Sequence, residues 1–398
     1  MSLKAKRKAA IIGVGETQYK THHPDKTYVE LAQEAALKAM QNAGVTPDEI
    51  DAVVFSMAPT EFMGVNDAEK WAIDAIAGAG KPFMRVHTGG ATGGSAVQAG
   101  YLHVASGLYE TVLVVGADKV SETPDAQFIL GLIWDQFYES DFALNTITMS
   151  AFQAVRHMHK YGTTEEQMAH VVVRSWKNAM NNPNAHLKGN LTIDEVLNSK
   201  RIAWPIKRYD CCPRSSGAAA VIITSERKAK ERSTNPAWIN GIGAITNTVF
   251  MGDKMGPYAA TDHGDWDELL LASKEAYRQA GITNPSKQID VAELYVPFSA
   301  IEMQAVEALG FCEKGMGGHY IADGYFDMDG TIPVNPSGGT LCANPIGVTG
   351  LVRVCDAANQ IMNQAGAAQV KNVQNAVATA VGGSEQFHTC VVLGADHV

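Results

Sequence analysis

Two stretches of the chain that lie far apart follow the same pattern, and this internal repeat restricts the possible folds more than any other feature. Residues 31–56 read LAQEAALKAMQNAGVTPDEIDAVVFS, and residues 270–299 read LLASKEAYRQAGITNPSKQIDVAELYVPFS. In each stretch an alanine-rich amphipathic helix is followed by a glycine stop, a short turn and an apolar strand. The sequence therefore predicts an α/β protein built from two related halves.

A second pair of segments supports the duplication. Residues 113–120 (LVVGADKV) resemble residues 391–398 (VVLGADHV), and each is an apolar strand followed by Gly-Ala-Asp. Helices are expected at about 97–106 and 348–365, so strands and helices alternate as in parallel βαβ units.

The organisation expected from this pattern has four segments. They are residues 1–120 as the first part of the N-terminal half, 121–200 as an insertion over the active site, 201–240 as the rest of that half, and 241–398 as the C-terminal half. The insertion is expected to be loop-like, because it is longer than its counterpart and richer in aromatic residues and Met.

Charge, hydropathy and cysteine content exclude several classes of function. The net charge of −10 does not favour nucleic acid or an anionic membrane as a partner. No apolar run reaches the roughly 20 residues that a transmembrane helix needs. Six cysteines without a CxxC pair indicate a reduced cytoplasmic protein with no metal site of its own.

Four stretches of sequence resemble the thiolase superfamily. They are residues 89–120, which begin GGATGGSAVQAG, residues 209–226 (YDCCPRSSGAAAVIITSE), residues 291–311 (VAELYVPFSAIEMQAVEALGF) and residues 335–350 (NPSGGTLCANPIGVTG). The resemblance spans nearly the whole chain. It implies the thiolase fold, in which duplicated βαβαβ halves form a five-layered α-β-α-β-α sandwich with helix pairs between two five-stranded sheets.

The residues on which ordinary thiolase chemistry depends are absent at the matching positions. The nucleophilic cysteine falls on Gly90, and the histidine of the N-E-A-F box falls on Tyr295. The histidine of the G-H-P loop falls on Asn344, in a loop one residue shorter than usual, and the second cysteine falls on Ala380. The resemblance therefore implies the family's scaffold without its usual catalytic groups.

Four polar residues remain as catalytic candidates. Tyr295 can donate to an oxyanion or take a proton, and Asn344 can donate its amide to a thioester carbonyl. His388, in the loop that follows Gly382 and Gly383, is a candidate base, and Cys342 is a candidate displaced nucleophile. Each also has a structural interpretation: a core tyrosine, a turn asparagine, a structural histidine and a buried thiol.

Glycine-rich turns supply the candidate substrate-binding groups. An open glycine loop that enters a helix can hold a thioester oxygen with its backbone N–H groups. The expected binding residues are His87, Gly89, Gly90, Gly338 and Gly339. Cys211 and Cys212 are instead expected in the core.

Three functions are compatible with these residues. The first is thiolysis of a bulky, possibly aromatic, 3-oxoacyl-CoA by direct attack of the CoA thiolate or through Cys342, as an acyltransferase resembling benzoylsuccinyl-CoA thiolase. The second is retro-aldol cleavage of a 3-hydroxyacyl-CoA, as in steroid side-chain aldolases, which needs a base but no nucleophile. The third is a non-catalytic subunit that supports an active partner. In the first two, coenzyme A belongs to the substrate and no cofactor is bound covalently.

Partners are implied by the resemblance. Thiolase-like chains pair as homodimers, and the two-subunit members work with a small subunit that carries an OB-fold and a zinc ribbon. A heterotetramer is therefore expected. The aromatic segment 128–142 (FILGLIWDQFYESDF) is expected either to line a wide acyl pocket or to contact a second chain.

Overall fold

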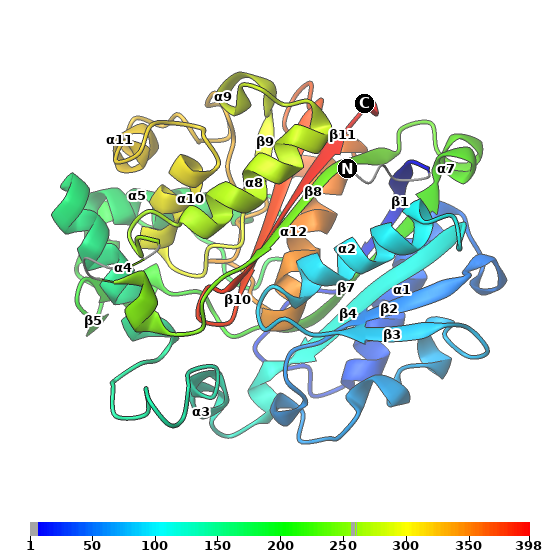
Figure 1. Ribbon diagram of the computed structural model, residues 1–398, viewed down its shortest axis with the longest axis horizontal. Coiled ribbons are helices and arrows are strands. Elements are labelled where there is room, and N and C mark those ends of the chain that lie inside the picture. Colours follow the sequence, from blue (N-terminus) through cyan, green and yellow to red (C-terminus); the bar gives the residue numbers. More distant parts are fainter. Residues whose placement is uncertain (1–6, 256–258, 260) are drawn as a thin grey trace.

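The computed structural model describes residues 7–255, 259 and 261–398, so the first six residues of the predicted N-terminal half lie outside the described part. The chain forms a mixed nine-stranded sheet in the order β3-β2-β4-β7-β1-β8-β11-β10-β9 (Figure 1). Its strands are β1 (Ala9–Glu16), β2 (Ala52–Ser56), β3 (Phe83–Val86), β4 (Thr111–Lys119), β7 (Ser216–Ser225), β8 (Ala237–Thr246), β9 (Val291–Glu293), β10 (Asn375–Gly382) and β11 (Phe387–Gly394). A separate small sheet pairs β5 (Arg201–Ala203) with β6 (Ile206–Lys207).

The large sheet consists of two unequal halves that meet between β1 and β8. Within the described residues, this junction pairs Ala10 with Trp238 and Ile11 with Ala237. The C-terminal half has four strands rather than the expected five. Val334, which lies beside β9, makes an isolated parallel bridge to Ala292 and does not extend into a strand.

Helices form the layers between and outside the two half-sheets. Helices α2 (Thr92–Ala105) and α12 (Ile346–Ile361) contact strands of both halves, while α1 (Tyr28–Ala43) packs on the N-terminal half and α8 (Asp267–Ala280) on the C-terminal half (Figure 1). Every residue of α12 except Asn359 is buried, as a central layer requires. The predicted α-β-α-β-α architecture is thereby confirmed. No helix in the described ranges is long and apolar enough to span a membrane.

The first predicted repeat is confirmed by the structure. Helices α1 and α8 end at Gly44 and Gly281, whose φ angles of 64° and 68° place both in the left-handed region that glycine tolerates. Each helix is followed by a buried strand, β2 in one half and β9 in the other.

The second predicted match is wrong as a structural equivalence. Strand β4 follows α2 and runs parallel to β2, whereas the strand that follows α12 and runs parallel to β9 is β10. Strand β11, which contains only the first half of VVLGADHV, runs antiparallel to both β10 and β8, as β7 does to β4 and β1. The sheet is therefore mixed, because each half returns on an antiparallel strand after its parallel units.

The segment expected to be loop-like, residues 121–200, is largely helical. It contains α3 (Ala126–Gly131), α4 (Thr146–Tyr161), α5 (Glu165–Ala179) and α6 (Ile193–Leu197). Helices α4 and α5 pack against α10 (Ser299–Ala308), and α5 also contacts α11 (Gly317–Ala322) at one end of the molecule (Figure 1). The two short helices α7 (Glu226–Arg232) and α9 (Pro285–Gln288) complete the fold.

A buried guanidinium joins α12 to β9 and to the NPSGG loop. Arg353 donates to Glu293 Oε2 at 2.9 Å and to Ser337 Oγ at 3.0 Å, and it pairs with Asp356 at 3.0 Å. Burial raises the pKa of Glu293 to about 8, as does the nearby Asp356, while Arg353 opposes this shift. The cation therefore offsets part of the cost of enclosing several carboxyl groups in the core.

We expect Arg353→Met to lower the free energy of unfolding by about 3–5 kcal/mol, because the buried carboxyls lose their cation. The matched control is Arg227→Met, whose side chain is 60% exposed beside Glu231. That loss should stay below about 1 kcal/mol. Urea unfolding followed by tryptophan fluorescence gives both values, and equal losses would contradict a special role for Arg353.

Candidate active site

A hollow of about 370 Å³ lies where loops from the two halves converge. Its walls include Gly89 and Gly90 before α2, Cys211, Cys212 and Arg214 before β7, Tyr295 after β9, Asn344 and Ile346 at the start of α12, and Val381, Gly382, Gly383 and Glu385 at the end of β10. Because a few polar groups converge among apolar walls, this hollow is the candidate active site.

Two pairs of glycines let the loops of the two halves touch without side chains. A Cβ on Gly89 would lie 2.7 Å from the backbone N of Gly383, and one on Gly382 would lie 2.2 Å from the carbonyl O of Thr88. The glycine-rich turn at Gly89 and Gly90 therefore packs closely against the opposite loop and also lines the hollow.

The tyrosine at the histidine-box position occupies the space next to Gly90. A Cβ on Gly90 would lie 3.1 Å from Tyr295 Oη and 2.5 Å from the carbonyl O of Val381. The Tyr295 hydroxyl donates to the carbonyl of Ile346 at 3.3 Å, and its backbone N–H donates to Thr379 Oγ1 at 3.0 Å. Burial, reinforced by Cys212, raises the Tyr295 pKa well above its usual range, so the phenol stays protonated and acts as a donor.

The asparagine at the start of α12 faces a cysteine across the hollow. Asn344 Nδ2 donates to Cys212 Sγ at 3.0 Å, and Asn344 Oδ1 accepts from Thr349 at 2.7 Å. These two hydrogen bonds orient the Asn344 side chain, with its N–H₂ group toward Cys212 and its carbonyl oxygen toward Thr349. Burial raises the pKa of Cys212 to about 12, so it is a neutral thiol in the unliganded site.

Cys342 does not line the hollow. It is fully buried beside Ala179 and Ala185, and its thiol approaches the carbonyl of Ser175 at 3.4 Å. Burial raises its pKa well above the usual thiol range, which disfavours the thiolate needed for attack.

The two glycines of the NPSGG loop also lie away from the hollow wall. Gly338 and Gly339 have φ angles of 93° and 63°, and Asn335 of the same loop has a φ of 53°. Asn335 accepts from the Leu294 N–H at 2.7 Å, directly before Tyr295. The loop therefore supports the Tyr295 backbone.

The two candidate histidines lie outside the residues that line the hollow. His87 is an exposed residue before the glycine turn, and partial desolvation, followed by Arg85, lowers its pKa. His388 is buried on β11 against Trp266, with ring centroids 5.2 Å apart. Burial, assisted by Lys254, lowers the His388 pKa to about 3, so its ring is neutral.

Sequence reasoning missed several polar residues of the hollow, among them Cys212, Arg214 and Glu385. Cys212 belongs to a segment expected in the core, and Arg214 follows it as an exposed cation at the rim. Glu385 lies two residues past the glycine pair Gly382-Gly383, and this proximity to the conspicuous loop was the available signal.

The apolar wall comes from the helical segment 121–200. Ile129, Leu130, Ile133, Ile147 and Met149 line the hollow. Part of the aromatic segment 128–142 thus faces the site, whereas four of its aromatic side chains are exposed: Phe128, Phe137, Tyr138 and Phe142.

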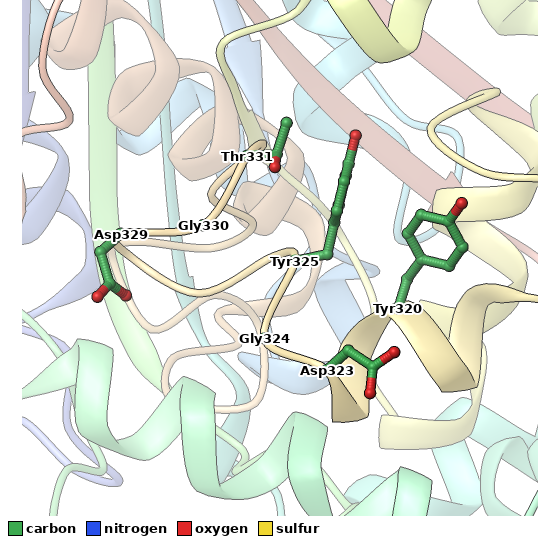
Figure 2. A pocket seen from close by; sticks show the side chains of 7 residues that line it. All are labelled: Tyr320, Asp323, Gly324, Tyr325, Asp329, Gly330 and Thr331. Carbon is green, nitrogen blue, oxygen red and sulfur yellow. The ribbon is translucent and has the colours of Figure 1, made fainter.

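A second hollow of about 440 Å³ lies beside α11 and is bordered by Tyr320, Asp323, Tyr325, Asp329 and Thr331. Figure 2 shows the two tyrosine rings rising on one side while the Asp329 carboxylate points to the other. Because its polar groups do not converge, this hollow lacks the arrangement expected of a catalytic site. No cluster of His, Cys, Asp or Glu side chains suited to a metal ion occurs in residues 7–255, 259 and 261–398.

Two family models cover most of the chain. The thiolase N-terminal domain matches residues 9–227, and the thiolase C-terminal domain-like family matches residues 261–395. The chain belongs to the thiolase family.

Similar proteins include both acyltransferases and lyases. The chain is 33% identical over 380 residues to an acetyl-CoA acetyltransferase of Methanothermobacter thermautotrophicus (95% of this chain and 97% of that one). It is 32% identical over 345 residues to a steroid side-chain-cleaving aldolase of Thermomonospora curvata (84% and 85%). The solved Ltp2-ChsH2(DUF35) aldolase aligns with a TM-score of 0.83 at 28% identity, covering 98% of both chains. An enzyme of this broad kind, acting on CoA thioesters, is therefore supported.

We expect Gly90→Ala to lower the free energy of unfolding by about 1–3 kcal/mol, because the new methyl overpacks the Val381 carbonyl and the Tyr295 hydroxyl. Gly131→Ala is the control, since a Cβ there meets nothing within 4 Å. Thermal unfolding of both variants measures the difference. If Gly90→Ala were as stable as the control, the glycine loop would have to accommodate the new methyl group without losing free energy of unfolding.

Proposed function

We propose that this chain catalyses retro-aldol cleavage of a bulky 3-hydroxyacyl-CoA to a shorter acyl-CoA and a ketone or aldehyde. The observation that carries the proposal is the contact between Gly90 and Tyr295. The position of the missing nucleophile has no side chain, and a phenol hydroxyl lies 3.1 Å from the point that a Cβ would occupy. A covalent acyl-enzyme at that point has no room, whereas retro-aldol cleavage needs none.

The residues of the hollow suit the charge that this reaction develops. Cleavage of the Cα–Cβ bond leaves an enolate on the thioester fragment, which hydrogen-bond donors in a dry site stabilise. Tyr295 is a neutral donor, and the Asn344 amide has a second N–H, besides the one that donates to Cys212, for an oxyanion. Backbone N–H groups of the glycine loops at Gly90 and Gly383 are further candidate donors.

The lining of the hollow offers surfaces for both parts of the proposed substrate, a bulky acyl group and CoA. The aliphatic side chains of Ile129, Ile133 and Met149 offer apolar surface for a large acyl group. Arg214 is an exposed cation on the same hollow and suits a phosphate of coenzyme A.

Thiolysis of a 3-oxoacyl-CoA is the second candidate, and one contact favours it. Cys212 lines the hollow and its sulfur accepts from Asn344, which would stabilise a thiolate. Either this thiol or the thiolate of CoA itself would attack the ketone. The pKa of about 12 for Cys212 weakens the first route at neutral pH.

Two substrates separate these functions. The purified protein is mixed with a bulky 3-hydroxyacyl-CoA without free CoA, or with the matching 3-oxoacyl-CoA plus CoA, and the shorter acyl-CoA is measured. CoA-independent cleavage supports the aldolase, and CoA-dependent cleavage supports the thiolase. Inactivity on both, alone and with a partner subunit, would indicate a non-catalytic chain.

Peptide mass spectrometry should find no acyl group on Cys212 or Cys342 if the aldolase proposal is correct.

We expect Tyr295→Phe to reduce turnover at least about a hundredfold, the effect of losing a positioned proton donor. Tyr277→Phe is the control, because Tyr277 is also buried and donates to the Leu309 carbonyl at 3.0 Å but does not line the hollow. Steady-state rates and circular dichroism are recorded for both. Near-normal turnover in Tyr295→Phe would show that the Tyr295 hydroxyl is not needed for catalysis and that the residue only packs in the core.

We also propose a homodimer of this chain that binds two small zinc-bearing OB-fold subunits. The solved relative named above is a two-protein aldolase, and this chain exposes an aromatic surface on Phe137, Tyr138 and Phe250 with rings 4.8 Å and 6.1 Å apart. Co-expression with such a subunit should give a heterotetramer containing zinc on size-exclusion chromatography. Full activity from a zinc-free homodimer would contradict the need for a partner.

A further inference from the structure

We propose that Glu385 is the general base of this site and removes the hydroxyl proton of the substrate. The proposal rests on the proposed retro-aldol function and names the group that this function requires. It stands on the place of Glu385 in the lining of the hollow and on the buried polar cluster around its side chain.

Glu385 sits in the hollow in a backbone conformation that its residue type rarely adopts. It lines the wall with Gly382 and Gly383, the residue is 3% exposed, and its φ is 66°. A left-handed backbone at a non-glycine residue costs about 1 kcal/mol or more and concentrates at functional sites. The loop is anchored nonetheless: Lys254 Nζ donates to the Ser384 carbonyl at 2.6 Å, and Ser384 Oγ donates to that of Val249 at 3.0 Å.

A histidine faces the Glu385 carboxylate from the side away from the loop. His263 Nδ1 lies 3.5 Å from Glu385 Oε2, and His263 Nε2 lies 3.4 Å from the carbonyl O of Met149. A carbonyl only accepts, so Nε2 carries the proton and Nδ1 presents a lone pair toward the carboxyl group. Burial lowers the His263 pKa to about 4, so this ring is neutral and can accept from a protonated Glu385.

The groups around Glu385 come from four further elements. Lys254 lies in the turn Met251–Lys254, Trp266 and Glu268 lie at the start of α8, Gln153 lies on α4, and His388 lies on β11. Burial raises the Glu385 pKa to about 8, Lys254 opposes this rise and Glu268 adds to it, and Gln153 and Trp266 lower the pKa. A carboxyl that titrates near neutral pH is suited to take and return a proton.

Several polar atoms of this cluster have no hydrogen-bond partner within the described residues. They are both ring nitrogens of His388, Nδ1 of His263 and Oε1 of Gln153. Each unpaired buried polar group costs about 1–3 kcal/mol. We infer that they tune the protonation of the carboxylate.

The chemical step balances without a cofactor. The Glu385 carboxylate takes the proton of the 3-hydroxyl, and the O–H electron pair forms the new carbonyl. The Cα–Cβ bond breaks, and its electron pair forms the thioester enolate. Protonated Glu385 then returns the proton to Cα, which yields the shorter acyl-CoA and restores the carboxylate.

The test compares the pH dependence of kcat/KM for 3-hydroxyacyl-CoA cleavage in the wild type and in Glu385→Gln. Because the carboxylate is the active form, wild-type activity should rise with pH and level off above about pH 8. Glu385→Gln should lose at least about a hundredfold and its pH dependence in this range. Glu385→Asp keeps a carboxylate in a residue that tolerates this backbone, so it should retain part of the activity and the rise with pH.

Glu307→Gln is the matched control. Glu307 is a buried carboxyl 3.2 Å from His157 Nε2, but it lies outside the hollow, so its loss should not change activity. If the wild type cleaves the substrate and Glu385→Gln cleaves it equally well with the same pH profile, the role of Glu385 is overturned while the aldolase function stands. If the wild type does not cleave it, the proposed function fails, and a base for that hydroxyl fails with it.

Discussion

The buried guanidinium of Arg353 is the interaction on which the position of the site depends. It holds Glu293 at the end of β9 and Ser337 in the NPSGG loop, 2.9 Å and 3.0 Å away. Ser337 also donates to Glu293 from its backbone N–H at 3.0 Å, and Asn335 accepts from the next residue, Leu294. Tyr295 follows directly, so the charged core fixes the strand end from which the phenol reaches the hollow.

Close contact between glycines provides the second constraint. Gly93 and Gly350 bring α2 and α12 together, and a Cβ on Gly93 would lie 2.2 Å from the Leu351 N. In the same way, the absence of side chains at Gly89 and Gly383 lets the two loops of the candidate site lie in contact. At Gly90, where the resemblance places the thiolase nucleophile, an added Cβ would meet the Val381 carbonyl and the Tyr295 hydroxyl, so the packing there fits a residue without a side chain.

The sequence allowed the layered fold and part of the site to be predicted. The amphipathic pattern of α1 and α8 and the glycine that ends each helix could be predicted from the local sequence. The sequence motifs likewise indicated Gly90, Tyr295 and Asn344 as residues of the candidate site. That β4 corresponds to β10 and not to β11 could not be predicted, because similar apolar strands carry no sign of parallel or antiparallel pairing. Cys212 and Glu385 were missed for a related reason: burial and convergence on a hollow arise from tertiary contacts between distant segments.

Burial acts on Tyr295 and Glu385 in the same direction but gives them different chemistry. Removing either group from water disfavours its anion and raises its pKa. Burial raises the pKa of the Tyr295 phenol from its ordinary value of 10.0 to well above that value, so the phenol keeps its proton and remains a donor. Burial raises the pKa of the Glu385 carboxyl from its ordinary value of 4.5 to about 8, where the group exchanges a proton readily near neutral pH. Burial thus suits Tyr295 to act as a donor and Glu385 to act as an exchangeable base, the two roles that the proposed cleavage without a nucleophile would use.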